Sequence, residues 1–142
     1  MGRYRILEDV AIADCALALE GDTLDDLFAT AARALAELMV DPATLPSDAT
    51  RTITLEAPAL DLLLHDWLAE LIFFKDRDAA IFPCADVRIT GDGPFALRAA
   101  VRGGTIDPAR TARRADAKAV TFHQLGVERT AEGWRARVVI DI

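Results

Sequence analysis

The chain has 142 residues, of which 52% are hydrophobic and 27% charged. Single domains commonly contain about 100–200 residues, so we expect one domain spanning residues 1–142. This composition excludes a disordered or fibrous protein. A chain of this length buries roughly two-thirds of the surface that its unfolded form exposes, which is enough to fold without disulfides or metal ions.

The formal net charge is −7, from 16 basic and 23 acidic side chains. A protein that coats nucleic acid usually carries the opposite sign, because phosphate contacts supply most of its affinity. The charge is also uneven: residues 1–100 hold 18 acidic and 8 basic side chains, and residues 101–142 hold 5 and 8. The composition therefore excludes a general nucleic-acid coat but predicts a locally basic C-terminal third.

Cys15 and Cys84 fit no metal-ligand spacing, and we expect both to be small buried side chains. No secretory signal is apparent at the N-terminus. No apolar run reaches the ~18–20 residues that a membrane span requires. These features predict a soluble, cytoplasmic protein without membrane contact.

The first half of the chain predicts two strands, a helix, a third strand and a second helix. Residues 3–7 and 15–20 predict two strands, the second by its alternation, and an acidic connection separates them. Thr23 is a plausible N-cap for a helix that Asp41 and Pro42 end. A strand over residues 51–56 precedes a helix with Pro58 in its first turn. The two helical stripes are Leu24, Leu27, Phe28, Ala31, Leu35, Leu38, Met39 and Leu60, Leu63, Leu64, Trp67, Leu68, Leu71, Ile72.

The second half predicts strands over residues 80–90, 95–102, 117–130 and 134–140, with turns at 91–93 and 131–133. The order is therefore β-β-α-β-α-β-β-β-β. We expect the α+β class, as a two-layer sandwich of two helices packed on a mainly antiparallel β-sheet.

Nucleophilic catalysis has little support in this sequence. Ser47 is the one serine and lies in no G-x-S-x-G motif. Nothing places either cysteine beside His65 or His123. Residues 91–96 match the G-x-G-x-x-A dinucleotide pattern, but a strand follows where that motif requires a helix. A hairpin turn is the better interpretation.

Oxygen ligands for a hard cation such as calcium are plentiful, although each acid alone is usually a solvated loop residue. The candidates are Asp9, Asp14, Asp76, Asp78, Asp141 and the terminal carboxylate of Ile142. Asp141 stands out because the last strand ends abruptly with this acid and one apolar residue. Two adjacent carboxylates at a sheet rim would repel, and a divalent cation or a basic partner would relieve that repulsion.

Residues 118–123 alternate, so that Lys118 and His123 would face opposite sides of a strand. A lone strand histidine is usually structural. The residues alone assign neither side chain a role.

Five separated segments of the chain resemble the archease family from end to end. They are 7–14 (LEDVAIAD), 21–28 (GDTLDDLF), 64–71 (LHDWLAEL), 118–123 (KAVTFH) and 139–142 (VIDI). The first differs from the Glu-His-Thr-Ala-Asp of many members, because it is two residues longer and lacks the histidine.

The resemblance implies a protein cofactor rather than an enzyme. Archeases are small acidic, chaperone-like proteins that activate the RtcB-type RNA ligase in tRNA splicing and RNA repair. They promote its GTP-dependent guanylylation and multiple turnover, so RNA is involved only indirectly. The family's calcium site corresponds here to Asp14, Asp141 and the carboxylate of Ile142, and Lys118 and His123 become candidates for partner contact or support.

Two other function classes remain open from the residues. A metal-dependent phosphoester hydrolase would use the same carboxylates to activate water. A small-molecule-binding module would use a pocket that the sequence does not reveal.

Overall fold

The computed structural model describes residues 2–11 and 14–142, with side chains described for 2–7 and 14–142. The strands are β1 (Arg3–Ala11), β2 (Asp14–Gly21), β3 (Ala49–Ala57), β4 (Ala80–Thr90), β5 (Phe95–Thr105), β6 (Ala119–Val120), β7 (Gly126–Arg129) and β8 (Trp134–Asp141). The helices are α1 (Leu24–Met39) and α2 (Leu60–Asp78), with a short 3₁₀ turn at Pro42–Thr44.

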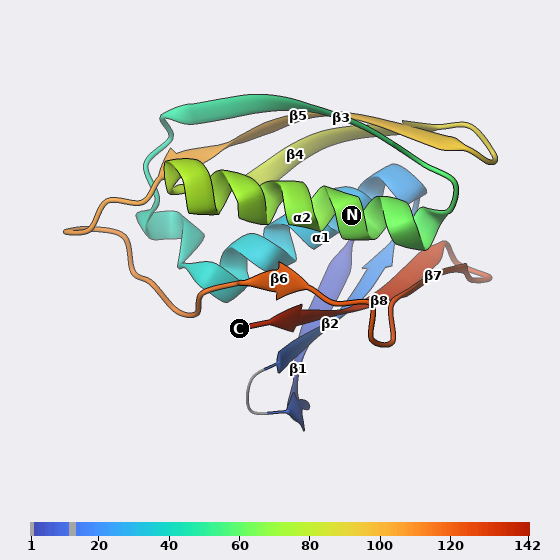
Figure 1. Ribbon diagram of the computed structural model, residues 1–142, viewed down its shortest axis with the longest axis horizontal. Helices are drawn as coiled ribbons and strands as arrows, with labels where there is room; N and C mark the ends of the chain where they lie inside the picture. Colours follow the sequence, from blue (N-terminus) through green and yellow to red (C-terminus); the bar gives the residue numbers. More distant parts are fainter. Residues whose placement is uncertain (1, 12–13) are drawn as a thin grey trace.

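The strands form two antiparallel sheets with both helices between them (Figure 1). One sheet has five strands, in the order β1-β2-β8-β6 with β7 also paired to β8, and the other has three, in the order β3-β5-β4. The predicted α+β class, the two helices and the antiparallel pairing are confirmed. The strands divide into two sheets instead of the one that we expected, and α1 packs on β4 of one sheet and on β2 of the other.

Helix α1 begins where the sequence predicted. The Thr23 hydroxyl accepts a hydrogen bond from the Asp26 backbone N–H at 3.1 Å, which satisfies one of the unpaired donors of the first turn. Asp25 and Asp26 lie in that turn, where the helix dipole favours negative charge. The helix is buried over most of its surface because a sheet covers it on each side.

Helix α2 is fixed to α1 by a buried tryptophan. The Trp67 side chain is fully buried, and its indole N–H donates a hydrogen bond to the backbone oxygen of Phe28 at 2.9 Å. The helix begins after Pro58, which precedes its first turn instead of lying in it. Within the described part of the chain, neither helix is long and apolar enough to cross a membrane.

Three local expectations differ from the structure. The strand expected over residues 117–130 divides into β6 and β7, because a turn follows Val120 and Gln124 adopts a left-handed φ of 54°. The acidic connection after residue 7 is largely strand, since β1 extends to Ala11. Cys84 is exposed on the three-stranded sheet, whereas Cys15 is buried as predicted.

The pairing of β2 with β8 runs through the middle of the five-stranded sheet. Its register extends from Asp14 opposite Asp141 to Gly21 opposite Trp134. One face of the pair, which includes Leu17, lies in the core. Because successive side chains in a strand point to opposite faces, the residues between these core positions form the outer face of the sheet.

Tyr4 ties the edge strand β1 to helix α1. Its hydroxyl donates a hydrogen bond to the Glu37 carboxylate, and the Arg33 guanidinium lies 5.6 Å from the centre of its ring. Burial, followed by this hydrogen bond and the negative charge of Glu37, raises the pKa of Tyr4 to about 12. The contribution of Tyr4 to stability is therefore fully present below pH 10, about the pKa of an unfolded tyrosine, and is lost as the pH rises towards 12.

This contact predicts a delayed tyrosine titration. Tyr4 is the one tyrosine in the chain, so phenolate absorbance reports on it alone. We expect a midpoint near 12 in the folded protein, and a lower midpoint in Glu37→Gln, because the amide removes the negative charge beside the phenol. Glu20→Gln, on the outer face of the neighbouring strand, serves as the control and should leave the midpoint unchanged. A wild-type midpoint near 10, the unperturbed value, would contradict the assigned contact.

Candidate functional site

Asp14 and Asp141 lie opposite each other in the ladder between β2 and β8. Directly opposed residues on antiparallel strands have Cβ atoms about 4.5–5.5 Å apart, and like charges in such a pair destabilise a sheet. Both residues are half-buried. Among the described side chains, neither carboxylate has a basic partner within hydrogen-bonding distance. The ladder thus holds two like charges together at the end of the sheet.

The terminal residue follows this acidic pair directly. The side chain of Ile142 is partly buried and packs against the core. The neighbouring strand approaches from the other side, since Ala119 is the ladder partner of Asp141 and the Lys118 backbone N–H donates to the Asp141 backbone oxygen at 2.8 Å. These contacts anchor Ile142 and hold Asp141 in a fixed position.

The chemistry of this donor set fits a hard divalent cation. It offers carboxylate oxygens, which calcium and magnesium prefer, and no imidazole or thiolate. No cluster of three or more histidine, cysteine, aspartate or glutamate side chains lies within the described residues. Beside the two aspartates, the terminal carboxylate of Ile142 would supply a third oxygen group. That ligand set remains a prediction.

Helix α2 secures the segment that lies beside Asp141. The Lys75 ammonium donates to the Ala117 backbone oxygen at 2.9 Å and to the Asp116 carboxylate at 2.6 Å. Almost three turns towards the start of the helix, the His65 ring nitrogen Nε2 lies 3.2 Å from the Val120 backbone oxygen. Segment 116–120 is therefore held to the helix at both ends.

Lys75 keeps its charge although its side chain is almost fully buried. Burial alone would lower the pKa of the Lys75 ammonium, but the hydrogen bonds that it donates to Asp116 and Asp76 outweigh that effect and raise the pKa above its usual value. The sequence held a signal for this contact that the prediction missed. Lys75 follows Leu64, Leu68 and Leu71 at helical spacing, so a charged residue occupies a position on the buried stripe.

The predicted residues Lys118 and His123 lie at different places. Lys118 is next to the acidic pair, directly before β6, and its side chain is exposed. His123 is in the turn after β6, and its backbone N–H donates to the Thr121 hydroxyl at 3.3 Å. The structure brings only Lys118 alongside Asp141, and a contact of either residue with a partner stays a prediction.

The other candidate acids are engaged elsewhere or fall outside the described side chains. Asp76 forms an ion pair with Lys75 at 2.5 Å. Hydrogen bonds from Arg77 and Arg51 lower the pKa of Asp78 to about 2. Asp9 has no described side chain. Among the acids with described side chains, the pair of Asp14 and Asp141 is thus the best candidate for a metal site.

The contact of Lys75 with segment 116–120 predicts where the protein opens when that contact is removed. Lys75→Met keeps the length of the buried side chain but leaves the Ala117 oxygen without its donor. We expect hydrogen exchange at the Lys118 and Thr121 amides to become about tenfold faster or more, since a lost hydrogen bond to a charged group costs about 1.5–3 kcal/mol. Exchange in α1 should be unchanged.

Lys118→Met is the matched control, because it removes an exposed lysine from the same segment. It should leave both exchange rates as they are in the wild type. Equal acceleration in the two variants, or acceleration spread over the whole chain in Lys75→Met, would count against a local anchoring role.

Comparison with known proteins gives matches over nearly the whole chain. The Methanosarcina acetivorans protein archease is 33% identical over 143 residues, covering 99% of this chain and 96% of that protein. The Methanopyrus kandleri protein archease is 34% identical over 131 residues, covering 92% and 94%.

Solved structures share the same fold. The solution structure of protein 1598 from Methanobacterium thermoautotrophicum matches with a TM-score of 0.80 and 27% identity over 98% of both chains. The crystal structure of an archease from Thermotoga maritima, described as a possible chaperone, matches with a TM-score of 0.65 and 19% identity, covering 97% of this chain and 98% of that one. The model of the archease protein family (MTH1598/TM1083) matches residues 4–142. With its full-length relatives and its shared fold, this chain is a member of the archease family.

Proposed function

We propose that this protein is a non-catalytic cofactor that activates an RtcB-type RNA ligase in the cytoplasm. It would promote the guanylylation of the ligase by GTP and allow repeated turnover in tRNA splicing and RNA repair. Membership of the archease family supports this proposal. The observation that carries it is the opposition of Asp14 and Asp141 at the end of the central strand pair.

The acidic pair has a physical reason to seek a positive partner. The hydrophobic pairing of β2 with β8 holds the two carboxylates together, so their repulsion is built into the folded protein. A bound cation or a basic surface would relieve that repulsion. The cleft in which a ligase binds nucleotide and RNA would offer such a surface, and complementary charges would speed the encounter and fix the orientation.

A divalent cation, expected to be calcium, would be held by Asp14, Asp141 and the terminal carboxylate of Ile142. When bound, it would supply a compact positive charge that relieves the repulsion of the pair and organises the end of the sheet. Other residues of the chain keep these ligands in position. Segment 116–120, anchored to α2, holds β8 in place beside the pair.

The metal proposal predicts effects of opposite sign on thermal stability. With EDTA, Asp141→Asn should stabilise the protein by roughly 0.2–1 kcal/mol, because it removes one of two opposed like charges. With calcium, the wild type should gain stability through binding to the folded state only, while Asp141→Asn gains little. Thermal melting in the two buffers measures both effects.

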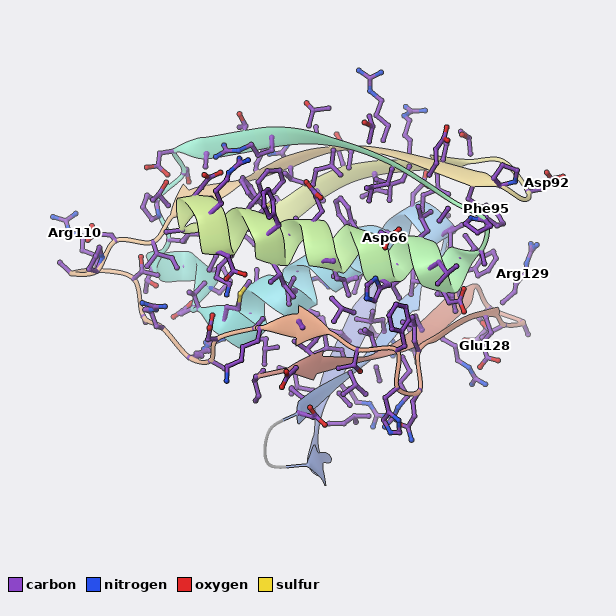
Figure 2. All side chains as sticks on the ribbon, viewed as in Figure 1. Asp66, Asp92, Phe95, Arg110, Glu128 and Arg129 are labelled. Atoms are coloured by element: carbon purple, nitrogen blue, oxygen red, sulfur yellow. The ribbon has the colours of Figure 1, made fainter. Side chains whose placement is uncertain are left out.

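Two further proteins make this test specific. Asp92→Asn makes the same chemical change in the exposed β4–β5 turn of the three-stranded sheet (Figure 2), and should respond to calcium like the wild type. Two glycines appended after Ile142 convert its carboxylate into an amide, and should abolish the response if that group is a ligand. An equal calcium response in wild type and Asp141→Asn would contradict the proposed site.

The activation proposal is tested with the full chain, the ligase, GTP and manganese. Transfer of label from GTP to the ligase is expected to accelerate when the chain is added. Asp14→Asn and Asp141→Asn should each reduce this acceleration about tenfold or more, because they remove charge from the docking end. Asp92→Asn should activate like the wild type.

The alternatives give different results in the same experiment. Hydrolysis of a phosphoester by the chain alone would favour a metal-dependent hydrolase. No acceleration, or full acceleration by both acidic-pair variants, would overturn the proposed role.

A further inference from the structure

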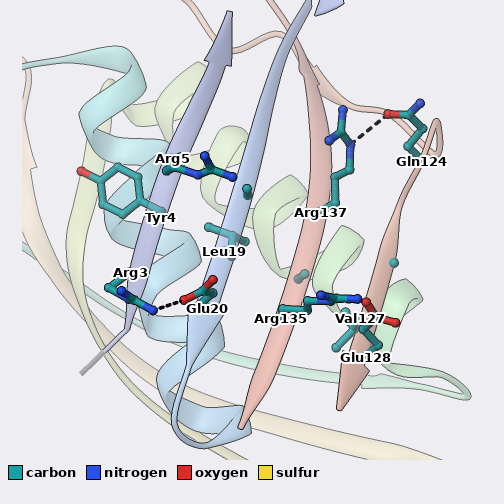
Figure 3. A pocket seen from close by; sticks show the side chains of 13 residues that line it. Arg3, Tyr4, Arg5, Leu19, Glu20, Gln124, Val127, Glu128, Arg135 and Arg137 are labelled. Atoms are coloured by element: carbon teal, nitrogen blue, oxygen red, sulfur yellow. Dashed lines mark hydrogen bonds and ion pairs between the residues drawn. The ribbon is translucent and has the colours of Figure 1, made fainter. Parts of the chain in front are cut away.

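The outer face of the five-stranded sheet carries a groove of about 740 Å³ (Figure 3). The groove lies towards the end of β2 that is away from Asp14. Its charged lining residues are Arg3, Arg5, Arg135, Arg137, Glu20 and Glu128. Four arginines against two glutamates leave two positive charges, in a chain whose net charge is −7. The groove is therefore positively charged, although the protein as a whole is negatively charged.

In one row of residues across the groove, the charged side chains neutralise one another. Arg3, Glu20, Arg135 and Glu128 follow one another across β1, β2, β8 and β7. The Arg3 and Glu20 side chains form one ion pair, and those of Arg135 and Glu128 form another (Figure 3). Alternating charges across four strands account for these four residues without a ligand.

The adjacent row is different, because no acid separates its two arginines. Arg5 and Arg137 are both ladder partners of Ala18, from β1 and β8. The Arg137 guanidinium donates to the neutral side chain of Gln124 at 2.9 Å, and Arg5 forms no ion pair with any described side chain (Figure 3). The two positive charges of the groove that no acid balances are therefore those of Arg5 and Arg137.

The space between and beside the two arginines is open. Ala18 presents only a methyl group, and Gly126, the next residue of the row on β7, has no side chain. A Cβ atom added to Gly126 would meet no other atom within 4 Å. Two strand spacings of 4.7–4.9 Å set the two arginine backbones about 10 Å apart, a span that both long side chains can bridge from either side.

A phosphomonoester matches this arrangement better than a carboxylate does. One guanidinium satisfies the two oxygens of a carboxylate in a bidentate pair. A phosphomonoester has three free oxygens and a charge of about −1.5 to −2 at pH 7, so it can engage two guanidinium groups and balance both charges. The absence of a carboxylate in this row among the described residues leaves that role to a ligand.

We propose that Arg5 and Arg137 form, across Ala18, a binding site for a phosphomonoester group of a nucleotide or of an RNA end. The site lies on the same face as the acidic pair, four residues along β2 and therefore about 13 Å away. It is independent of the ligase activation proposed above, and its test uses this chain without the ligase.

The test is a titration of the isotope-labelled full chain, followed by NMR at the arginine side-chain N–H groups. The probes are adenosine 5′-monophosphate, adenosine, a short 5′-phosphorylated RNA and the same RNA with a 5′-hydroxyl. The two phosphorylated probes should shift the Arg5 and Arg137 signals, and the other two should not. Similar affinities for both phosphorylated probes assign recognition to the phosphate alone, and tighter binding of the RNA assigns the site to an RNA end.

Variants distinguish a specific binding site from nonspecific electrostatic attraction. Arg5→Gln and Arg137→Gln should each weaken binding about tenfold or more, the factor expected for a charged hydrogen bond. Gly126→Glu places a competing carboxylate in open space beside Arg137 and should block binding without disturbing the core. Arg98→Gln, the same charge change on the exposed face of the three-stranded sheet, should bind like the wild type.

Three results would overturn the proposal. One is the absence of shifts at both arginines with adenosine 5′-monophosphate. Another is equal binding of the phosphorylated and hydroxyl RNAs, which would indicate recognition of the diester backbone. The third is tighter binding of a pentaglutamate peptide than of the nucleotide, which would indicate an acidic protein segment.

Discussion

The pairing of β2 with β8 is the constraint on which the rest of this molecule depends. It joins segments more than a hundred residues apart and forms the middle of the five-stranded sheet. Leu17 faces Val138, and Cys15 faces Ile140, all within the core. A slip of one residue would turn every side chain of a strand to the other face, and would bury the acids while exposing these apolar residues. The hydrophobic core therefore fixes the register.

The same register creates both candidate sites. Asp14 opposes Asp141 because Cys15 must face Ile140, and Arg5 and Arg137 flank Ala18 because Leu19 must face the core. Neither arrangement is favourable by itself, since each concentrates charge of one sign. The stability gained by burying the other face is what makes these concentrations tolerable, at roughly 1.5–3 kcal/mol for each large apolar side chain. A ligand or partner of opposite charge that binds at either place would relieve this repulsion.

Much of the fold follows from local sequence signals. The Thr23 cap, the apolar stripes of both helices and the hairpin turns all predict elements that the structure contains. The division of the strands into two sheets was not predictable, because periodicity shows which residues of a helix are buried but not what covers them. The burial of α1 over most of its surface follows from its position between the two sheets.

The candidate sites were predictable only in part for the same reason. The abrupt end of the last strand indicates Asp141, and resemblance to the archease family indicates Asp14. Their opposition, and the hold of Lys75 and His65 on segment 116–120, depend on contacts between residues far apart in the chain. The row of Arg5, Ala18 and Arg137 draws on three strands, so no short motif contains it.

The distribution of charge over the outer sheet face has a consequence for docking. Negative charge gathers around Asp14 and Asp141, and about 13 Å along the strands positive charge gathers around Arg5 and Arg137. A partner with a basic surface opposite the acids meets repulsion if it docks the other way round, because its positive charge would then face the arginines. Such like-charge contacts cost several kcal/mol and select orientation more than they add affinity. An acidic protein with this charge pattern can therefore present itself to a basic surface in one preferred orientation.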